Sequence, residues 1–262
     1  MTNKLVRRLT ILVLAVTYVA STWANQNQTK ISLEAVGTIF CDGAIRGTAS
    51  HVHHERKEHS IVLTAAHVLF DPTTRSAFRT CSYRASNARF QNFPISKIST
   101  PRKILQDSYA LEGMKRDWVF ASLNNKLYAP ALQLRRDLQE SLPSTKKNLS
   151  ITMLAYDKHA DKIRKIEDCG TMQSYNIEDP SVLIHNCGHG SGFSGAPLLD
   201  TRTRELLGVH GGRLVLSKPP NDNIVDILGQ ARLIDNEVLN ELRRFSASLR
   251  YHRKIDTNQL EN

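Results

Sequence analysis

The chain has 262 residues, of which 40% are hydrophobic, and its formal net charge at pH 7 is +10. This length and apolar content suffice for one large or two small buried cores, so we do not expect a disordered chain. Lysine and arginine are spread through the sequence beside other polar residues. This distribution is typical of a solvated surface and argues against nucleic acid as a partner.

Residues 1–24 have the pattern of a secretory signal peptide. Basic residues precede an apolar run from Leu9 to Ala20, and small residues follow as far as Ala24. The run is shorter than the roughly 20 residues that span a membrane, and an uncleaved anchor is the alternative. Cleavage before Asn25 removes three positive charges and leaves a mature net charge of +7. We expect a secreted or periplasmic protein without stable membrane association after cleavage.

Short segments with the composition of β-strands recur along the rest of the chain, between turn signals. They are 34–40, 47–52, 60–68, 93–98, 117–123, 149–156, 181–186, 196–200, 205–212 and 225–234. Many short strands predict an all-β sandwich or barrel. A polar, mixed stretch at 124–148 separates the two strand-rich halves and is a candidate linker. The last segment has apolar residues at helical spacing behind a candidate cap, Asp235, and predicts a C-terminal helix.

Four cysteines suit a chain that folds in an oxidising compartment. They are Cys41, Cys81, Cys169 and Cys187, and they allow three pairings. The spacing favours Cys41 with Cys81 and Cys169 with Cys187, because each pair then stays within one half of the molecule. No CxxC motif occurs, which argues against a zinc or thioredoxin-like site.

Three segments carry the residue types of nucleophilic catalysis. Ser194 stands among small residues in GSGFSGAPL, and a serine hydroxyl becomes a nucleophile only when a base takes its proton. His67 follows an apolar run and three small residues, which let an imidazole approach other parts of the chain. Asp117 leads directly into the apolar run WVFASL, where a carboxylate can be buried and still orient a histidine. Asp107 is the rival acid.

Glycines on both sides of the serine permit backbone conformations that other residues avoid. Gly192 and Gly195 therefore allow the N–H groups of Gly192 and Ser194 to converge on one point. Such a point is an oxyanion hole, which stabilises negative charge on a carbonyl oxygen during acyl transfer. A polar glycine-rich turn without catalytic function is the alternative for this segment.

TAAHV, DWVFASL and GFSGAP together resemble the chymotrypsin-like (trypsin-like) serine peptidases, in particular the bacterial branch near the glutamyl endopeptidases. The order His67, Asp117, Ser194 suits that family, whereas α/β-hydrolases have serine, acid and then histidine. The resemblance covers nearly the whole mature chain. It implies an all-β fold of two six-stranded antiparallel Greek-key barrels with a C-terminal α-helix. The implied domains are 25–125, 126–234 and a helix and tail at 235–262.

The resemblance also implies a function. Ser194 would attack peptide bonds and form an acyl-enzyme, His67 would act as general acid and base, and Asp117 would orient His67. No metal or cofactor is needed, the partner is a polypeptide substrate, and we expect a monomer. The cysteine loop that ends at Cys187, just before the nucleophile, is similar to the family as well.

Two departures from the family's animal members concern activation and specificity. Phe193 stands where many of them carry the aspartate that pairs with a new N-terminus after zymogen cleavage, although Ile31 after Lys30 is similar to such a terminus. We therefore expect signal removal alone to give an active enzyme. The segment CGHGSGFSG contains no acid, so a preference for Lys or Arg in the substrate is not expected.

His210 in LLGVHGG matches the histidine with which glutamyl endopeptidases receive a substrate carboxylate, and His189 lies where the pocket floor is expected. With Gly211 they form the candidate substrate-binding set. We predict Glu or Asp before the scissile bond, with a polar or aromatic residue as the alternative. His210 has a second interpretation as a strand histidine bonded to backbone.

Other function classes stay open. A protease-like binding module with a basic surface and lapsed catalysis is one, and an esterase with the same triad is another. Histidines crowd into ASHVHHERKEHSIV and suggest a metal site, but a hairpin with a charged tip is favoured, because a polar stretch separates two apolar runs.

Overall fold

The computed structural model describes residues 33–56, 58–86, 91–99, 111–136, 149–172, 179–218 and 223–258. The expected signal peptide and the rival acid Asp107 lie outside these residues, as do residues 137–148 of the candidate linker.

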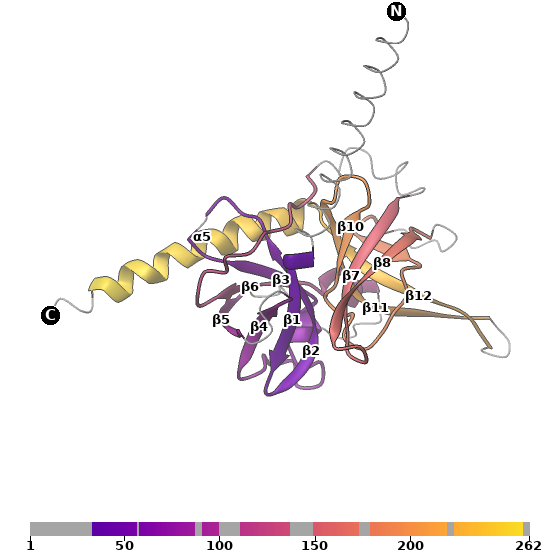
Figure 1. Cartoon of the computed structure of the whole chain (residues 1–262), viewed down its shortest axis with the longest axis horizontal. Coiled ribbons are helices and arrows are strands. Elements are labelled where there is room, and N and C mark those ends of the chain that lie inside the picture. Colours follow the sequence, from indigo (N-terminus) through magenta and orange to yellow (C-terminus); the bar gives the residue numbers. More distant parts are fainter. Residues whose placement is uncertain are drawn as a thin grey trace, which may run out of the picture.

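The N-terminal half is a closed antiparallel barrel with the strand order β1-β2-β3-β6-β5-β4 (Figure 1). Its strands are β1 (Val36–Cys41), β2 (Ala44–Val52), β3 (Ile61–Thr64), β4 (Cys81–Ala85), β5 (Phe93–Ile98) and β6 (Val119–Leu123). The strand β3 is buried at every position, because it lies between β2 and β6 and turns its side chains both into the barrel and against the second half. The predicted first barrel is confirmed.

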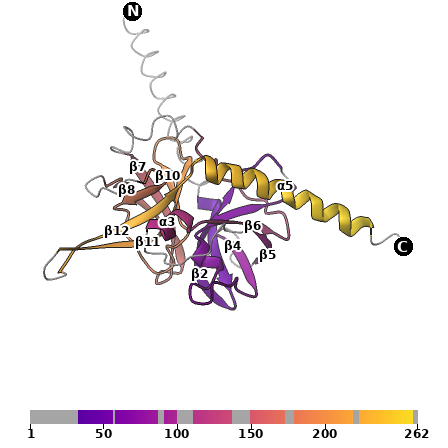
Figure 2. The ribbon, with the colours of Figure 1, turned by 180° about the vertical axis from the view of Figure 1, so that it is seen from behind.

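The C-terminal half is a six-stranded antiparallel sheet with the order β8-β7-β10-β11-β12-β9. Its strands are β7 (Ser150–Asp157), β8 (Lys162–Gly170), β9 (Val182–His185), β10 (Pro197–Asp200), β11 (Leu206–Lys218) and β12 (Asn223–Leu233). The two edge strands meet through an isolated bridge between Thr171 and His185, without a continuous ladder. Among the described residues, this bridge and two neighbouring backbone bonds, from Met172 to Ile184 and from Asn186 to Gly170, close the second barrel. The β11–β12 hairpin extends away from the body of the molecule (Figures 1 and 2).

Both favoured disulfides are present. Cys41 and Cys81 are register partners on β1 and β4, and their bond crosses the first barrel's ladder. The bond between Cys169 and Cys187 ties β8 to the segment after β9, beside the Thr171–His185 bridge. This second bond thus reinforces the weak closure of the second sheet, directly before the segment that contains Ser194.

The predicted C-terminal helix is α5 (Asn236–Asn258), which begins beside the end of β12 and runs along the first barrel in Figure 2. The carboxylate of Asp235 accepts the N–H of Val238 at 3.1 Å, so the expected cap is confirmed. Val238, Leu242 and Phe245 are buried in a core shared by residues of both sheets. Among the helices that the structure describes, none is long and apolar enough to cross a membrane.

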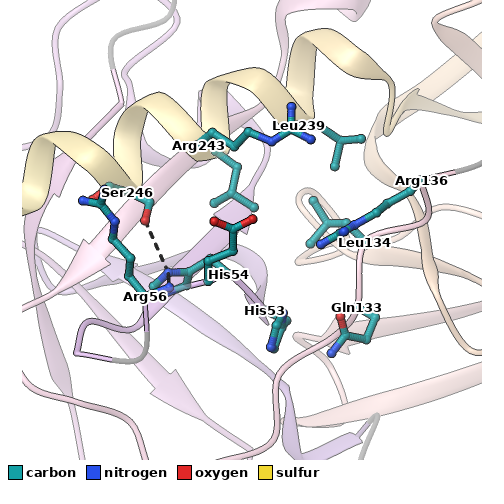
Figure 3. Close-up of a pocket in the computed structure, with 11 residues that line it drawn as sticks. His53, His54, Arg56, Gln133, Leu134, Arg136, Leu239, Arg243 and Ser246 are labelled. Atoms are coloured by element: carbon teal, nitrogen blue, oxygen red, sulfur yellow. Dashed lines mark hydrogen bonds between the residues drawn. The ribbon is translucent and has the colours of Figure 1, made fainter.

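The histidine-rich segment forms the expected β2–β3 hairpin. Its histidines diverge: His51 bonds the carbonyl of Pro130 and His54 that of His59, each at 3.0 Å. The loop of the hairpin lies against α5, where it borders a cavity of about 210 Å³ (Figure 3). Within the described ranges, no group of three or more His, Cys, Asp or Glu residues is close enough to hold a metal.

Candidate active site

His67 lies on a single helical turn, α2 (Ala66–Leu69), that follows β3. The sequence suggested that the strand itself carries the histidine to the barrel edge, but the strand ends at Thr64. The turn buries Ala66, Val68 and Leu69 in the barrel core. The imidazole, pointing away from that core, keeps 24% of its side-chain surface exposed.

Asp117 lies between the short helix α3 (Leu111–Arg116) and β6, and only 1% of it is exposed. Its two carboxylate oxygens lie 2.9 and 2.8 Å from Nδ1 of His67, and one of them also accepts the His67 backbone N–H at 3.1 Å. The carboxylate has no proton to give, so Nδ1 of His67 carries the proton and Nε2 is the acceptor. Asp117 therefore fixes the ring's tautomer and direction.

Two opposing effects act on the pKa of His67. Burial disfavours the imidazolium and lowers the pKa, whereas the charge and hydrogen bond of Asp117 favour it. Asp117 outweighs burial, and the pKa is raised above its ordinary value of 6.5. The ring is thus prepared to hold a proton that it receives at Nε2.

The Ser194 loop is attached to both halves of the molecule. The carbonyl of Ser194 accepts the N–H of Thr48 on β2 at 2.8 Å, and the N–H of Gly195 donates to the backbone carbonyl of His210 on β11 at 2.7 Å. Gly195 has a φ of +83°, and a Cβ there would collide with the carbonyl of Thr48 and the hydroxyl of Thr64. Only glycine lets the loop lie this close to the strand that precedes His67.

The N–H groups of the loop divide into paired and unpaired. Those of Phe193, Gly195 and Ala196 donate to backbone carbonyls. Those of Gly192 and Ser194, the two expected oxyanion donors, have no acceptor in the described part of the chain. Neither does a hydrogen bond join the Ser194 hydroxyl to Nε2 of His67 there, a contact that often forms only with substrate bound.

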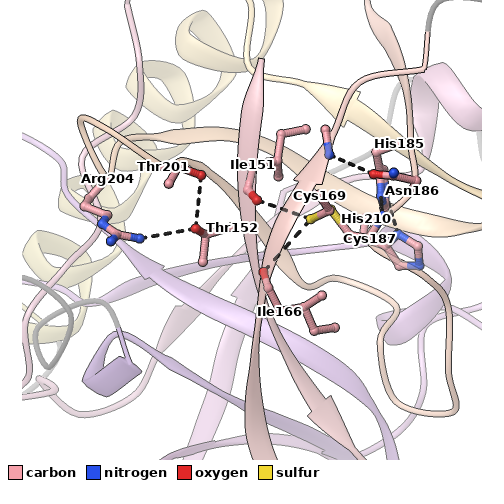
Figure 4. Close-up of a disulfide and its surroundings, with 11 residues drawn as sticks. Ile151, Thr152, Ile166, Cys169, His185, Asn186, Cys187, Thr201, Arg204 and His210 are labelled. Atoms are coloured by element: carbon pink, nitrogen blue, oxygen red, sulfur yellow. Dashed lines mark hydrogen bonds between the residues drawn. A yellow bond between two sulfur atoms is a disulfide. The ribbon is translucent and has the colours of Figure 1, made fainter. Parts of the chain in front are cut away.

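His210 and His185 form a buried pair next to this loop (Figure 4), with exposures of 1% and 0%. The N–H of Cys187 donates to Nδ1 of His185 at 3.2 Å, so His185 carries its proton on Nε2. That Nε2 lies 3.1 Å from Nδ1 of His210, which must then accept and leave its own proton on Nε2. The chain of bonds assigns both tautomers.

Burial lowers the pKa of both histidines, that of His185 to about 3 and that of His210 well below its usual value. Both rings are therefore neutral at pH 7. The charges of His67, Asp117 and His189 also affect the pKa of His210, which places it near the catalytic candidates. His189 itself is exposed, so the structure does not put it on a buried pocket floor.

The sequence did not reveal three residues of this region. Thr48 contacts the Ser194 loop, but a threonine in a strand carries no special signal. His185 was visible only as a lone histidine in an apolar run. Gln230 is 2% exposed, and its Oε1 has no partner among the described residues. Its amide lies against the Cα side of Gly211, where a Cβ would approach it to 2.4 Å.

No family model matches this chain, and no curated protein matches it by sequence. Solved structures do match. A Glu endopeptidase has 13% identity and a TM-score of 0.60 over 82% of this chain and 91% of that one. The thermostable serine protease AL20 from an extremophilic microorganism has 12% identity and a TM-score of 0.57 over 80% and 96%.

Kallikrein-related peptidase 10 has 14% identity and a TM-score of 0.55, and the match covers 83% of this chain and 97% of that one. These three proteins share one architecture and differ widely from this chain in sequence. The likenesses therefore show the fold, and the chain has the two-barrel fold of the chymotrypsin-like serine peptidases.

Proposed function

We propose that this protein is a serine endopeptidase with Ser194 as nucleophile, His67 as general base and acid, and Asp117 as the residue that orients His67. The observation that carries the proposal is the bond of His67 Nδ1 to both oxygens of the buried Asp117. That bond leaves Nε2 of His67 unprotonated. The Ser194 loop packs on Thr64 and Ala65, which directly precede the helical turn of His67. The fold of the three solved proteases supports the same conclusion.

The first half of the reaction acylates the serine. The Ser194 Oγ attacks the carbonyl carbon of the scissile peptide while His67 Nε2 takes the hydroxyl proton. The N–H groups of Gly192 and Ser194 donate to the carbonyl oxygen as it becomes negative, and the loss of one such donor typically costs about 100- to 1,000-fold in rate. His67 then gives the proton to the leaving amine, and the C–N bond breaks.

The second half releases the acid product. Water attacks the acyl-enzyme carbonyl, and His67 Nε2 takes the water proton. The same two N–H groups stabilise the second tetrahedral intermediate. His67 then returns the proton to Ser194 Oγ, which leaves as the C–O bond breaks. The Asp117 carboxylate stabilises the imidazolium that forms in each half.

The setting of this activity is an oxidising compartment. Two disulfides join all four cysteines, which suits a secreted or periplasmic protein. The signal pattern of residues 1–24 supplies the route, and the substrate is a polypeptide. We expect the mature enzyme to act as a monomer.

We further propose that His210 makes the enzyme prefer an acidic residue before the scissile bond. Because His185 donates to Nδ1 of His210, the Nε2 of His210 is a hydrogen-bond donor. A substrate carboxylate at that nitrogen accepts a charge-assisted hydrogen bond, which is stronger than the bond that a neutral amide oxygen accepts. Glutamate should therefore bind more tightly than glutamine while His210 stays neutral.

Paired peptides that differ only in Glu or Gln before the scissile bond test this preference. We expect kcat/KM at pH 7 to be roughly tenfold higher for Glu, because a hydrogen bond to a charged acceptor is about twice as strong as one to a neutral acceptor. His210→Leu, which has no donor, should bring the Glu/Gln ratio close to one. A library whose cleavage sites carry mainly Lys or Leu at this position would refute the acidic preference.

A fluorophosphonate probe tests the catalytic proposal itself. Protein beginning at Asn25 should be labelled at one residue, Ser194, as located by mass spectrometry, and Ser194→Ala should not react. Labelling without further trimming would also support activity after signal removal alone. If the folded, disulfide-bonded protein is not labelled, the binding-module alternative gains and the proposed function fails.

A further inference from the structure

Thr48 on β2 is completely buried and uses every one of its hydrogen-bonding groups. Its hydroxyl donates to the carbonyl of Gly192 at 2.7 Å and accepts the N–H of Tyr156 at 2.9 Å. Its backbone N–H donates to the carbonyl of Ser194 at 2.8 Å. Its own carbonyl accepts the hydroxyl of Thr64 at 2.7 Å. Two of these four bonds hold the nucleophile loop.

The peptide carbonyls from residue 191 to residue 194 are all held. Ser191 accepts from Lys158, Gly192 and Ser194 accept from Thr48, and Phe193 accepts from Ala196. In a planar trans peptide the C=O and N–H point in opposite directions. The bonds to the carbonyls of Ser191 and Phe193 therefore turn the N–H groups of Gly192 and Ser194 outward. Thr48 holds the peptide between them through the carbonyl of Gly192, and the next peptide through the carbonyl of Ser194.

The residue before the nucleophile takes no part in an ion pair. Phe193 is 7% exposed, and its ring packs in the core of the second sheet with Cys187 and Leu198. The aspartate that pairs with a new N-terminus in many peptidases of this fold is thus replaced by an apolar anchor. The loop needs another restraint at Gly192, whose φ is +96°.

We propose that Thr48 is a positioning residue whose hydroxyl holds the Gly192–Ser194 peptides in the orientation that the oxyanion requires. In this chain no proteolytically released N-terminus would be needed for that orientation. The inference rests on the proposed serine peptidase function. Thr48 touches no reacting atom. It acts through the carbonyl of Gly192. The same hydroxyl accepts the backbone N–H of Tyr156 and so links that carbonyl to β7.

Thr48→Val tests the hydroxyl, because valine keeps the shape and loses both side-chain bonds. We expect the fluorophosphonate labelling rate of Ser194 and the kcat on a peptide substrate to fall about 10- to 100-fold, with KM within about threefold of wild type. Affinity for a peptide boronic acid, which puts an oxygen into the oxyanion hole, should fall with kcat. Thr48→Ser should restore all three.

Thr38→Val is the matched control. Thr38 lies opposite Thr48 in the β1–β2 register, is 6% exposed, and makes no side-chain hydrogen bond in the described residues. It should label as fast as wild type. If Thr48→Val does not fold, Thr48→Ala removes the same hydroxyl without placing a methyl group against the Gly192 carbonyl.

The outcomes separate the two proposals. Failure of the wild-type protein to label defeats the proposed function. Normal labelling of wild type together with unchanged labelling of folded Thr48→Val, or with Thr48→Ser as slow as Thr48→Val, overturns the inference alone. Equal losses for Thr48→Val and Thr38→Val also overturn it, because they would indicate a general packing effect.

Discussion

The two halves of the molecule each have six strands, but they bury different chemistry. Among the described residues of the first barrel, the buried polar ones are serines and threonines apart from His51 and Asp117. The second sheet buries His185, Gln230 and Arg232, among others. The first half thus keeps one carboxylate for one imidazole, while the second half builds a polar interior beside the nucleophile loop. Under the proposed function, the first half orients the catalytic histidine and the second half sets the specificity.

The two halves also differ in how their sheets close. The first barrel closes through a continuous ladder, whereas the second sheet closes through the Thr171–His185 bridge and the Cys169–Cys187 disulfide. His185 takes part both in that closure and in the bond to His210. The weakest point of the second sheet is therefore also the support of its buried histidine pair.

A buried arginine connects the halves. Arg232 on β12 is 1% exposed and forms ion pairs with Asp235 and Glu237, at 2.9 and 3.0 Å. Its Nε donates to the carbonyl of Lys115 at 2.8 Å, two residues before Asp117. Arg232 of the second half thereby holds the segment that positions Asp117 of the first half.

The largest effect should come from Asp117→Asn. The amide removes the charge that stabilises the His67 imidazolium and can hold the wrong tautomer, so we expect kcat to fall about 10,000-fold with KM little changed. Asp71→Asn, in the exposed loop after α2, is the control and should leave kcat unchanged. A loss of less than tenfold for Asp117→Asn in steady-state kinetics would contradict the assigned role.

The sequence predicted the parts of this site that depend on order and composition. Strand-like runs between turns gave the all-β class, and His67, Asp117 and Ser194 stood out through their small or apolar neighbours. The sequence could not predict Thr48, because its importance arises from β2 lying against a loop more than 140 residues away. For the same reason, the incomplete closure of the second sheet depends on tertiary packing that no local pattern records.

Removal of either disulfide should have the next largest effect, and its consequences should differ between the two halves. Because each bond restricts the unfolded chain, its loss should lower the free energy of unfolding by about 3 kcal/mol for the Cys169–Cys187 loop and by slightly more for the Cys41–Cys81 loop. Despite similar losses of unfolding free energy in urea, only the double change Cys169→Ser and Cys187→Ser should lower kcat, by about tenfold, because it loosens the segment before Ser194. Equal kcat for both double variants, measured where both are folded, would remove this distinction.

Acid should destabilise the second half before the first. The buried neutral His185 has its pKa lowered to about 3 from 6.5, so the unfolded chain binds more protons between these values. Its contribution to stability is complete above pH 6.5 and declines as pH falls, by about 2 kcal/mol at pH 5. His185→Gln should flatten this decline in urea unfolding curves. An equally steep decline in that variant would locate the effect elsewhere.

The smallest effect concerns His67, whose contribution to stability changes with pH in the opposite direction to that of His185. Its pKa is raised by Asp117, so its contribution to stability is complete below pH 6.5 and is lost as pH rises through the folded-state pKa. Activity follows the reverse course, since only the neutral ring can take the Ser194 proton. The acid limb of kcat/KM should therefore have its midpoint above pH 6.5.

Asp117→Asn should move that midpoint below 6.5, because burial then acts alone on the pKa of His67. The His185→Gln variant should leave it in place, although it changes acid stability, because the two histidines belong to different halves and face different partners. A midpoint that moves equally in both variants would mean that the halves titrate as one unit, and the division between an orienting half and a specificity half would fail.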